Sequence, residues 1–161
     1  MRIELIRKNL EELELDGVLI SYTNNVQFLS GFKGTAGELF VTAEGAYLVT
    51  DFRYLTQAKE QTKNIEIVDV AEGEANIYRR LCEKHGIKKL GFEGKYVTYN
   101  RFVVLKEIFE GVSLVSTEHL VENHRMAKDA DELAALKKAC LVADEAFEAV
   151  LPAIKVGISE L

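Results

Sequence analysis

The segment spanning residues 24–54 reads NNVQFLSGFKGTAGELFVTAEGAYLVTDFRY and decides the fold. A short helix and a glycine-rich loop precede two apolar strands, at 39–42 and 46–50. We expect Gly45 to adopt the positive φ that the tight turn between those strands needs. Asp51 follows directly and can cap a further helix with its carboxylate. This order of elements predicts a hairpin set within a layer of helices and strands.

The same alternation of elements continues on both sides of this segment. Apolar residues at three- and four-residue steps, preceded by a capping residue or followed by glycine, indicate helices. Short apolar runs indicate buried strands. The expected helices span 3–13, 74–85 and 98–109, and the expected strands span 18–20, 65–70, 89–92 and 112–115. Strands joined through a helix lie parallel and those of a hairpin lie antiparallel, so we predict an α/β fold with a mixed sheet and flanking helices.

A different pattern begins in the C-terminal quarter of the chain. Asp129 or Asp131 can cap a long helix. Its apolar face is formed, at three- and four-residue steps, by Leu133, Leu136, Cys140, Ala143, Phe147 and Leu151. Ser159 would cap yet another helix, but two residues later the sequence ends. We therefore predict a domain at 1–124 and, at 125–161, a linker with the first helix of a second domain that is truncated here.

The composition disfavours several classes of protein. The 161 residues carry a formal net charge of −6, which disfavours binding to a nucleic-acid backbone. No apolar run approaches the roughly 18 residues that cross a membrane, and the N-terminus lacks the apolar core of a signal peptide. Cys82 and Cys140 have no metal-ligand spacing, and we expect two reduced thiols. These observations predict a soluble cytoplasmic protein that binds neither nucleic acid nor membrane.

Motifs for catalysis are missing from the sequence. His119 and His124 are a close pair, but a step of five residues places the two rings apart on a helix. There is no GxSxG motif, and the glycine-rich loop lacks the ending of a phosphate-binding loop and leads into a strand. Four scattered acids could be imagined as a nuclease-like cluster, namely Glu38, Glu44, Asp69 and Glu93. The acidic balance argues against that cluster, and we expect no catalytic residue and no metal site in this chain.

The glycine-rich loop at 31–37 is explained as the turn that leads the chain into the hairpin. We expect Phe32 and Lys33 to be exposed on this loop, which makes both candidates for contact with another molecule.

The segment 51–54 allows two interpretations. In the first, Asp51 caps a helix, Phe52 packs and Arg53 pairs with a carboxylate of the same chain. In the second, Arg53 binds a carboxylate of a neighbouring molecule, for which its planar guanidinium group is suited.

Four segments, taken together and in this order, resemble motifs of the creatinase/prolidase family, the Xaa-Pro peptidases. Residues 25–32 resemble the family segment N-x-x-Y-L-[ST]-G-F, with Phe28 where tyrosine is common. Residues 50–54 resemble T-D-x-R-Y. Residues 125–132 resemble R-x-x-K-[DS]-x-x-E, at which the catalytic domain begins. Residues 156–160 resemble x-G-[ML]-[ST]-E, with isoleucine at the third position.

The resemblance implies a fold and a role. It implies a ribonuclease H-like N-terminal domain of an enzyme that cleaves short peptides before proline, using two metal ions, usually Mn²⁺ or Co²⁺. The metal ligands would lie in a catalytic domain beyond Leu161, so no cofactor is implied in this chain. In the family the N-terminal domain builds dimer or tetramer contacts and narrows the partner's active site. By position, Phe32, Lys33, Arg53 and Tyr54 are the candidates for substrate gating or partner contact.

Two alternatives stay open at this point. The parent could instead be a creatinase-like amidinohydrolase, which shares this domain. The chain could also be a stand-alone α/β binding module, although the unfinished helix start at Ser159 argues against that alternative.

Overall fold

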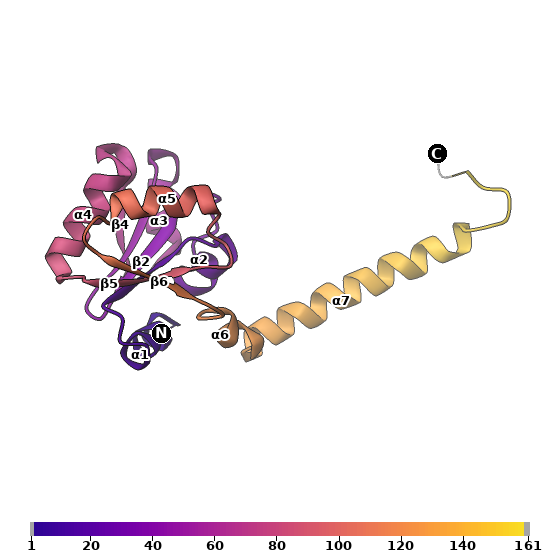
Figure 1. The fold of residues 1–161 in the computed structure, drawn as a ribbon. Coiled ribbons are helices and arrows are strands. Elements are labelled where there is room, and N and C mark those ends of the chain that lie inside the picture. The colour runs from indigo at the N-terminus through magenta and orange to yellow at the C-terminus, as the bar shows by residue number, and fades with distance from the viewer. Residues whose placement is uncertain (1, 160–161) are drawn as a thin grey trace. The chain divides into compact units, whose positions relative to one another are not determined.

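The computed structural model describes residues 2–159, and the chain divides into two compact units, Met1–Arg125 and Met126–Leu161. The first unit is an α/β domain and the second is dominated by one long helix (Figure 1). Before the long helix, the helices are α1 (Arg2–Glu12), α2 (Thr23–Ser30), α3 (Leu55–Gln61), α4 (Glu74–His85), α5 (Tyr99–Ile108) and α6 (Glu122–Met126). The strands are β1 (Gly17–Ile20), β2 (Glu38–Thr42), β3 (Ala46–Thr50), β4 (Glu66–Asp69), β5 (Lys89–Glu93) and β6 (Ser113–Thr117).

A mixed sheet forms the centre of the first unit. Within residues 2–159 it has six strands in the order β4-β3-β2-β1-β5-β6. β2 pairs antiparallel with both β1 and β3, whereas the pairs β3–β4, β1–β5 and β5–β6 are parallel. The predicted α/β fold with a mixed sheet and a hairpin is therefore confirmed.

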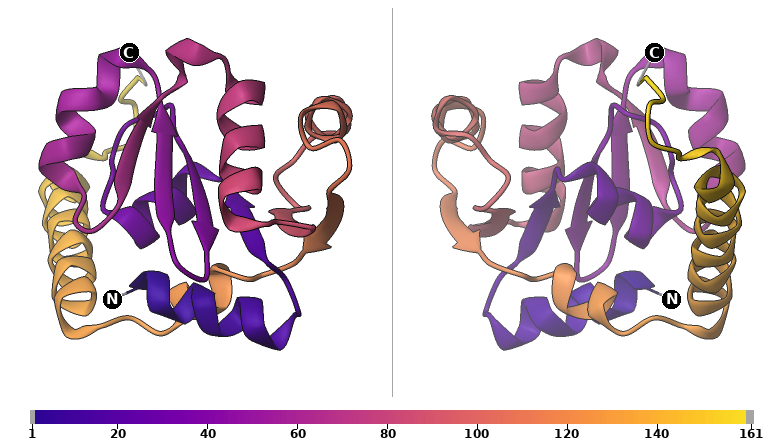
Figure 2. Two further views of the ribbon diagram at one scale, coloured as in Figure 1. Left: turned by 90° about the vertical axis from the view of Figure 1, so that its left-hand side faces the viewer. Right: turned by 90° about the vertical axis from the view of Figure 1, so that its right-hand side faces the viewer.

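Different helices bury the two faces of this sheet, because successive side chains of a strand point to opposite faces. In β1, Val18 and Ile20 belong to one hydrophobic cluster and Leu19 to the other. The first cluster packs against α1, α2 and α3, and the second against α4 and α5 (Figure 2). Since both faces are covered, the central strands are apolar at nearly every position.

Glycines end two helices as the sequence predicts, and one glycine behaves differently. Gly31 and Gly86 follow α2 and α4 in the left-handed region, with φ of 81° and 61°. Gly45 does not adopt the predicted positive φ. Instead, Thr42 closes the hairpin turn, because its Oγ1 accepts a 2.9 Å hydrogen bond from the Gly45 N–H. Gly45 is required here for space, since a Cβ atom at this position would meet the ring of Tyr47.

The second unit contains the helix α7 (Ala130–Val150). Of the two predicted caps, Asp129 is the one observed, and it forms a reciprocal capping box with Glu132. All six residues of the expected apolar face are exposed in this chain. Ser159, the last described residue, is not in a helix. The expected further helix depends on the last two residues, which lie outside the described part of the chain.

Among the residues that the structure describes, none of the helices combines the length and the apolar content needed to cross a membrane.

Replacing Leu48 with alanine tests the assigned core. Leu48 is fully buried in the cluster beneath α1, α2 and α3. We expect Leu48→Ala to lower the free energy of unfolding by about 2–5 kcal/mol, measured by urea denaturation, because it removes buried methyl groups and leaves a cavity. Val104→Ala on α5, where the side chain is 42% exposed, is the control and should change it by less than about 1 kcal/mol. Equal losses in both variants would contradict this core.

Candidate functional site

The glycine-rich loop is folded over the ring of Phe32, which is 1% exposed. A Cβ atom added to Gly34 or Gly37 would clash with this ring, so both glycines lie directly against it. Tyr54 packs edge-on against Phe32, with ring centroids 5.8 Å apart, and its hydroxyl shares a 2.7 Å hydrogen bond with Thr35. The predicted exposure of Phe32 is therefore wrong, because the loop uses this ring as its own core.

Lys33 is exposed on the same loop, as predicted. Its backbone N–H donates a 2.8 Å hydrogen bond to Oε1 of Gln61, which attaches the loop to the end of α3. Within the described residues its ammonium group has no ion-pair partner. Lys33 therefore presents an available positive charge on a fixed loop.

Arg53 is bound by its own chain. Its guanidinium group donates to both carboxylate oxygens of Asp51, at 2.9 and 2.7 Å, and its backbone N–H donates a third hydrogen bond to the same residue. These hydrogen bonds lower the pKa of Asp51. The pairing of Arg53 with a carboxylate of the same chain is thus observed, and Asp51 caps the 3-10 helix η1 (Phe52–Tyr54) as predicted.

Phe52 differs from its prediction. Its side chain is 76% exposed rather than packed, because the 3-10 turn that directs Tyr54 toward Phe32 leaves Phe52 on the outside. The loop residues Lys33 and Thr35 and the turn residues Phe52, Arg53 and Tyr54 belong to two segments that the Thr35–Tyr54 hydrogen bond joins, and together they are called the loop face below.

A second polar site was not found from the sequence. Asn25 is fully buried in α2, and its side-chain amide makes three hydrogen bonds. Nδ2 donates to Oε1 of Glu93 at 2.6 Å and to Oε1 of Glu122 at 2.8 Å, and Oδ1 accepts from Nη1 of Arg125 at 2.8 Å. These four residues, called the Asn25 network below, connect α2, the end of β5 and α6.

The two carboxylates of the Asn25 network are in different electrostatic states. Glu93 is 5% exposed and also accepts 2.7 Å hydrogen bonds from the backbone N–H groups of Ser21 and Tyr22. Burial raises the pKa of Glu93 despite these hydrogen bonds. For Glu122, burial also acts to raise the pKa, but hydrogen bonds from Asn25, from its own backbone and from Tyr96 together lower it. Glu122 is therefore the carboxylate more firmly held in its charged form.

Two tyrosines adjoin this network. The rings of Tyr22 and Tyr96 are stacked, with centroids 3.8 Å apart and planes within 5°. The hydrogen bond between Tyr96 and Glu122 raises the pKa of Tyr96 to about 12. Asn25 and Arg125 are the first residues of two motifs in the family resemblance. Their presence in these motifs was the signal in the sequence that could have pointed to the network.

The acids considered for a nuclease-like cluster have separate partners. Glu38 accepts from Nη2 of Arg101 at 2.9 Å and from the hydroxyl of Tyr78 at 2.6 Å, and Glu74 shares the same arginine. Burial raises the pKa of Glu38. Glu93 belongs instead to the Asn25 network. These acids therefore stabilise the contacts between strands and helices.

The structure also shows where the remaining candidate ligands lie. Nε2 of His124 is 2.6 Å from Oδ1 of Asn9, and His119 is exposed. Cys82 and Cys140 are both free thiols. Over the described range 2–159, no group of three or more His, Cys, Asp and Glu side chains could hold a metal ion.

Together these features define a class of protein, namely an α/β domain that has, within the described residues, a mixed six-stranded sheet and a polar network that includes the last residue of the domain. The family model of the creatinase/prolidase N-terminal domain matches residues 2–127, and the chain belongs to this family. The resemblance seen in the four sequence motifs is thereby confirmed.

Individual relatives give the same assignment. YqhT of Bacillus subtilis, described as an uncharacterized peptidase, is 35% identical over 161 residues, which are all of this chain and 46% of that protein. An Xaa-Pro dipeptidase structure from Bacillus anthracis has a TM-score of 0.93 at 35% identity, over 99% of this chain and 44% of that one. The N-terminal domain structure of the cytoplasmic peptidase PepQ from Mycobacterium tuberculosis has a TM-score of 0.69 at 34% identity, over 76% of this chain and 96% of that one. The chain thus spans less than half of its full-length relatives and corresponds to the N-terminal domain of the Xaa-Pro peptidase family.

Asn25→Asp tests the buried network. The new carboxylate would replace the donor that Glu93 and Glu122 share, so three acids would face one another around Arg125. We expect the free energy of unfolding to fall by about 3 kcal/mol at pH 8, measured by urea denaturation. Asn24→Asp is the matched control, because Asn24 is exposed, and should have little effect.

The pH dependence of Asn25→Asp has a defined sign. Like charges raise the pKa values of buried carboxyls in the folded state above their unfolded values, so the folded state binds more protons and stability rises as pH falls. The difference in the free energy of unfolding between Asn25→Asp and the unmodified chain should therefore become smaller as the pH falls from 8 to 5. A difference that is constant over this range would contradict the electrostatic explanation.

Proposed function

We propose that this chain is the non-catalytic N-terminal domain of a metal-dependent, cytoplasmic Xaa-Pro peptidase, and that it supports assembly of a dimer and restricts access of substrates to the active site. The observation that carries the proposal is the match over 44% of the Xaa-Pro dipeptidase from Bacillus anthracis, with a TM-score of 0.93. The proposed substrates of the parent are short proline-containing peptides. A creatinase-like parent is less well supported, because the relatives described above are peptidases.

The proposed catalytic half would carry two Mn²⁺ or Co²⁺ ions, which would activate the attacking water. The residues of this chain do not fit such a centre, since within 2–159 no three potential ligands converge. We therefore assign no step of hydrolysis to this chain. Its proposed contribution is to position the catalytic half and to narrow the access of substrates to the active site.

The Asn25 network supports the positioning role. Arg125 is the last residue of the first unit, and its hydrogen bond to Asn25 attaches it to a fully buried side chain. The capping residue Asp129 follows four positions later and starts α7. In this proposal the network fixes the point at which the chain leaves the domain toward the catalytic half.

The apolar face of α7 supports the existence of a partner domain. Leu136 and Phe147 are 51% and 64% exposed, and they belong to a stripe at helical spacing. Such a stripe is normally buried in a folded protein. The occupant that we propose is the parent's own catalytic half, since this chain spans less than half of its full-length relatives.

The loop face supports the gating role. Lys33 carries a charge without an ion-pair partner in the described part of the chain, and Phe52 and Arg53 are exposed on the 3-10 turn that contacts its loop. Phe32 and Tyr54 hold these groups on a packed loop rather than on a loose one. A fixed, charged and partly aromatic edge is suited to narrowing the opening of a neighbouring active site. Phe32 acts in this proposal as the support of the gate.

The gating role is tested in the full-length protein expressed from its native gene. We expect Lys33→Ala and Arg53→Ala to raise kcat/KM for a proline-containing pentapeptide by about 3- to 10-fold relative to an Xaa-Pro dipeptide, because a smaller edge admits longer substrates. Lys63→Ala, which removes a lysine outside the loop face, is the control. An unchanged ratio of the two kcat/KM values in both variants would contradict gating. A full-length protein without peptidase activity would contradict the proposed parent.

A further inference from the structure

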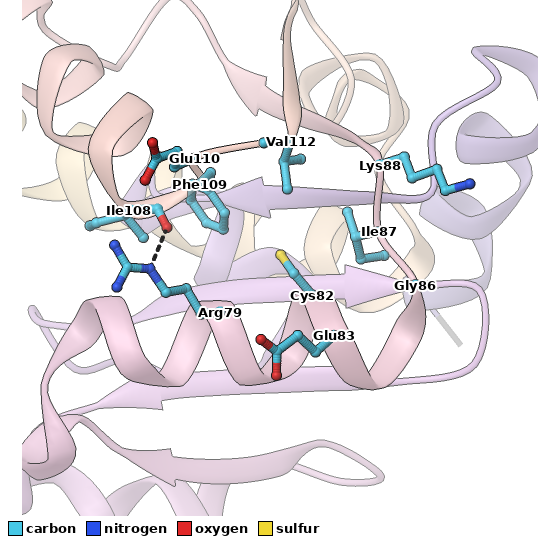
Figure 3. Close-up of a pocket in the computed structure, with 11 residues that line it drawn as sticks. Arg79, Cys82, Glu83, Gly86, Ile87, Lys88, Ile108, Phe109, Glu110 and Val112 are labelled. Atoms are coloured by element: carbon cyan, nitrogen blue, oxygen red, sulfur yellow. Dashed lines mark hydrogen bonds between the residues drawn. The ribbon is translucent and has the colours of Figure 1, made fainter.

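A cavity of about 410 Å³ opens between the C-terminal ends of α4 and α5 (Figure 3). It lies where β5 and β6 begin, whereas Glu93 of the Asn25 network lies where β5 ends. The cavity and that network therefore lie at opposite ends of the strands. Its size is within the range of small-molecule sites, which is about 300–1,000 Å³.

The base of the cavity is apolar. Figure 3 shows Cys82 directed from α4 into the space between Phe109 and Ile87, with Val112 above it. Burial, with a smaller effect from Glu83, raises the pKa of Cys82 to about 11, so the thiol is neutral at physiological pH. This base is suited to an uncharged, apolar group.

The rim carries charges of both signs that lack ion-pair partners. Arg79 is held at one end by hydrogen bonds from its guanidinium group to the backbone oxygens of Ile108 and Glu107, both at 3.3 Å. Glu83 lies one helical turn after Arg79 on α4, and Glu110 lies on the opposite wall. Lys88 is a fourth charged residue at the rim, and among residues 2–159 none of these four charged groups forms a salt bridge.

This arrangement discriminates between classes of ligand. A neutral apolar molecule would leave the four charges without a partner. A simple carboxylate would meet Glu83 and Glu110 as well as the two cations, and a simple amine would meet Arg79 and Lys88 as well as the two carboxylates. The C-terminal ends of α4 and α5 add partial negative charge, which favours an ammonium group near the carboxylates. A molecule with adjacent ammonium and carboxylate groups and an apolar body satisfies all of these groups together.

We propose that this cavity binds a free α-amino acid with an apolar side chain. Its carboxylate is bound by the guanidinium group of Arg79, its ammonium group by Glu83 and Glu110, and its side chain by the base around Cys82 and Phe109. The site goes beyond the proposed function, because it uses neither the loop face nor the catalytic half. It can therefore be tested in this chain, and its failure would not affect the peptidase assignment.

The first test is an NMR titration of the ¹⁵N-labelled chain with L-leucine, N-acetyl-L-leucine and L-leucinamide. We expect L-leucine to shift the amide signals of Gly86 and Gly111 with a dissociation constant on the order of 1 mM. Each analogue lacks one charge and should bind at least about tenfold more weakly. No shift at roughly 20 mM L-leucine, or equal binding of all three compounds, would overturn the proposal.

Variants separate the site from its surroundings. Glu110→Gln should weaken L-leucine binding about tenfold, because it removes one charge that contacts the ammonium group. Glu107→Gln is the matched control, since its side chain lies on the same helix end but outside this cavity, and it should leave binding unchanged. Equal effects of the two variants would contradict the assigned contacts.

The thiol gives an independent readout. In a Cys140→Ser chain, Cys82 is the remaining cysteine and lies at the base of the cavity. At L-leucine concentrations ten times the dissociation constant, its alkylation by N-ethylmaleimide should slow by roughly tenfold, because about one cavity in eleven stays free. An unchanged alkylation rate at that concentration would place any bound L-leucine elsewhere and overturn the proposal.

Discussion

The side-chain amide of Asn25 is the interaction on which the organisation of the first unit depends. It is fully buried, and it donates to two carboxylates while accepting from one guanidinium group. Removing such a group takes one hydrogen bond from each of three charged side chains at once, which costs more than a single hydrogen bond contributes. Because Asn25 lies on α2 and its partners lie on β5 and α6, the amide connects these three elements. The end of the first unit is thereby attached to the ends of α2 and β5.

The polar features of the first unit are divided between the two ends of the strands of its sheet. The Asn25 network, the loop face and the ion pairs of Arg101 lie around the ends of β1, β3 and β5 and the start of β2. In parallel α/β sheets, functional groups usually lie at the carboxyl ends of the strands. The amino-acid cavity that we propose lies at the opposite ends of the strands, between the C-terminal ends of α4 and α5. The two ends of the strands can therefore serve the proposed peptidase role and the proposed amino-acid binding without sharing a side chain.

Local patterns were sufficient to predict most of the fold but little of the site. Short apolar runs predicted the strands around the hairpin, and the glycines that follow α2 and α4 predicted the ends of these helices, because both depend on neighbours in the sequence. The burial of Phe32 depends on a ring at position 54, and the exposure of Phe52 depends on the same turn. The Asn25 network joins residues 68 to 100 positions apart. No local pattern reports such contacts, although the family resemblance contained both Asn25 and Arg125.

The central claim is that this chain is one part of a larger peptidase and that α7 is packed in the parent. Amide hydrogen exchange over residues 130–150, compared between this chain and the full-length protein, tests that claim most directly. The account predicts fast exchange in the isolated, monomeric chain and at least about a hundredfold slower exchange in the full-length protein. Strong protection of α7 in the monomeric chain alone would contradict the account, because it would show a self-contained module.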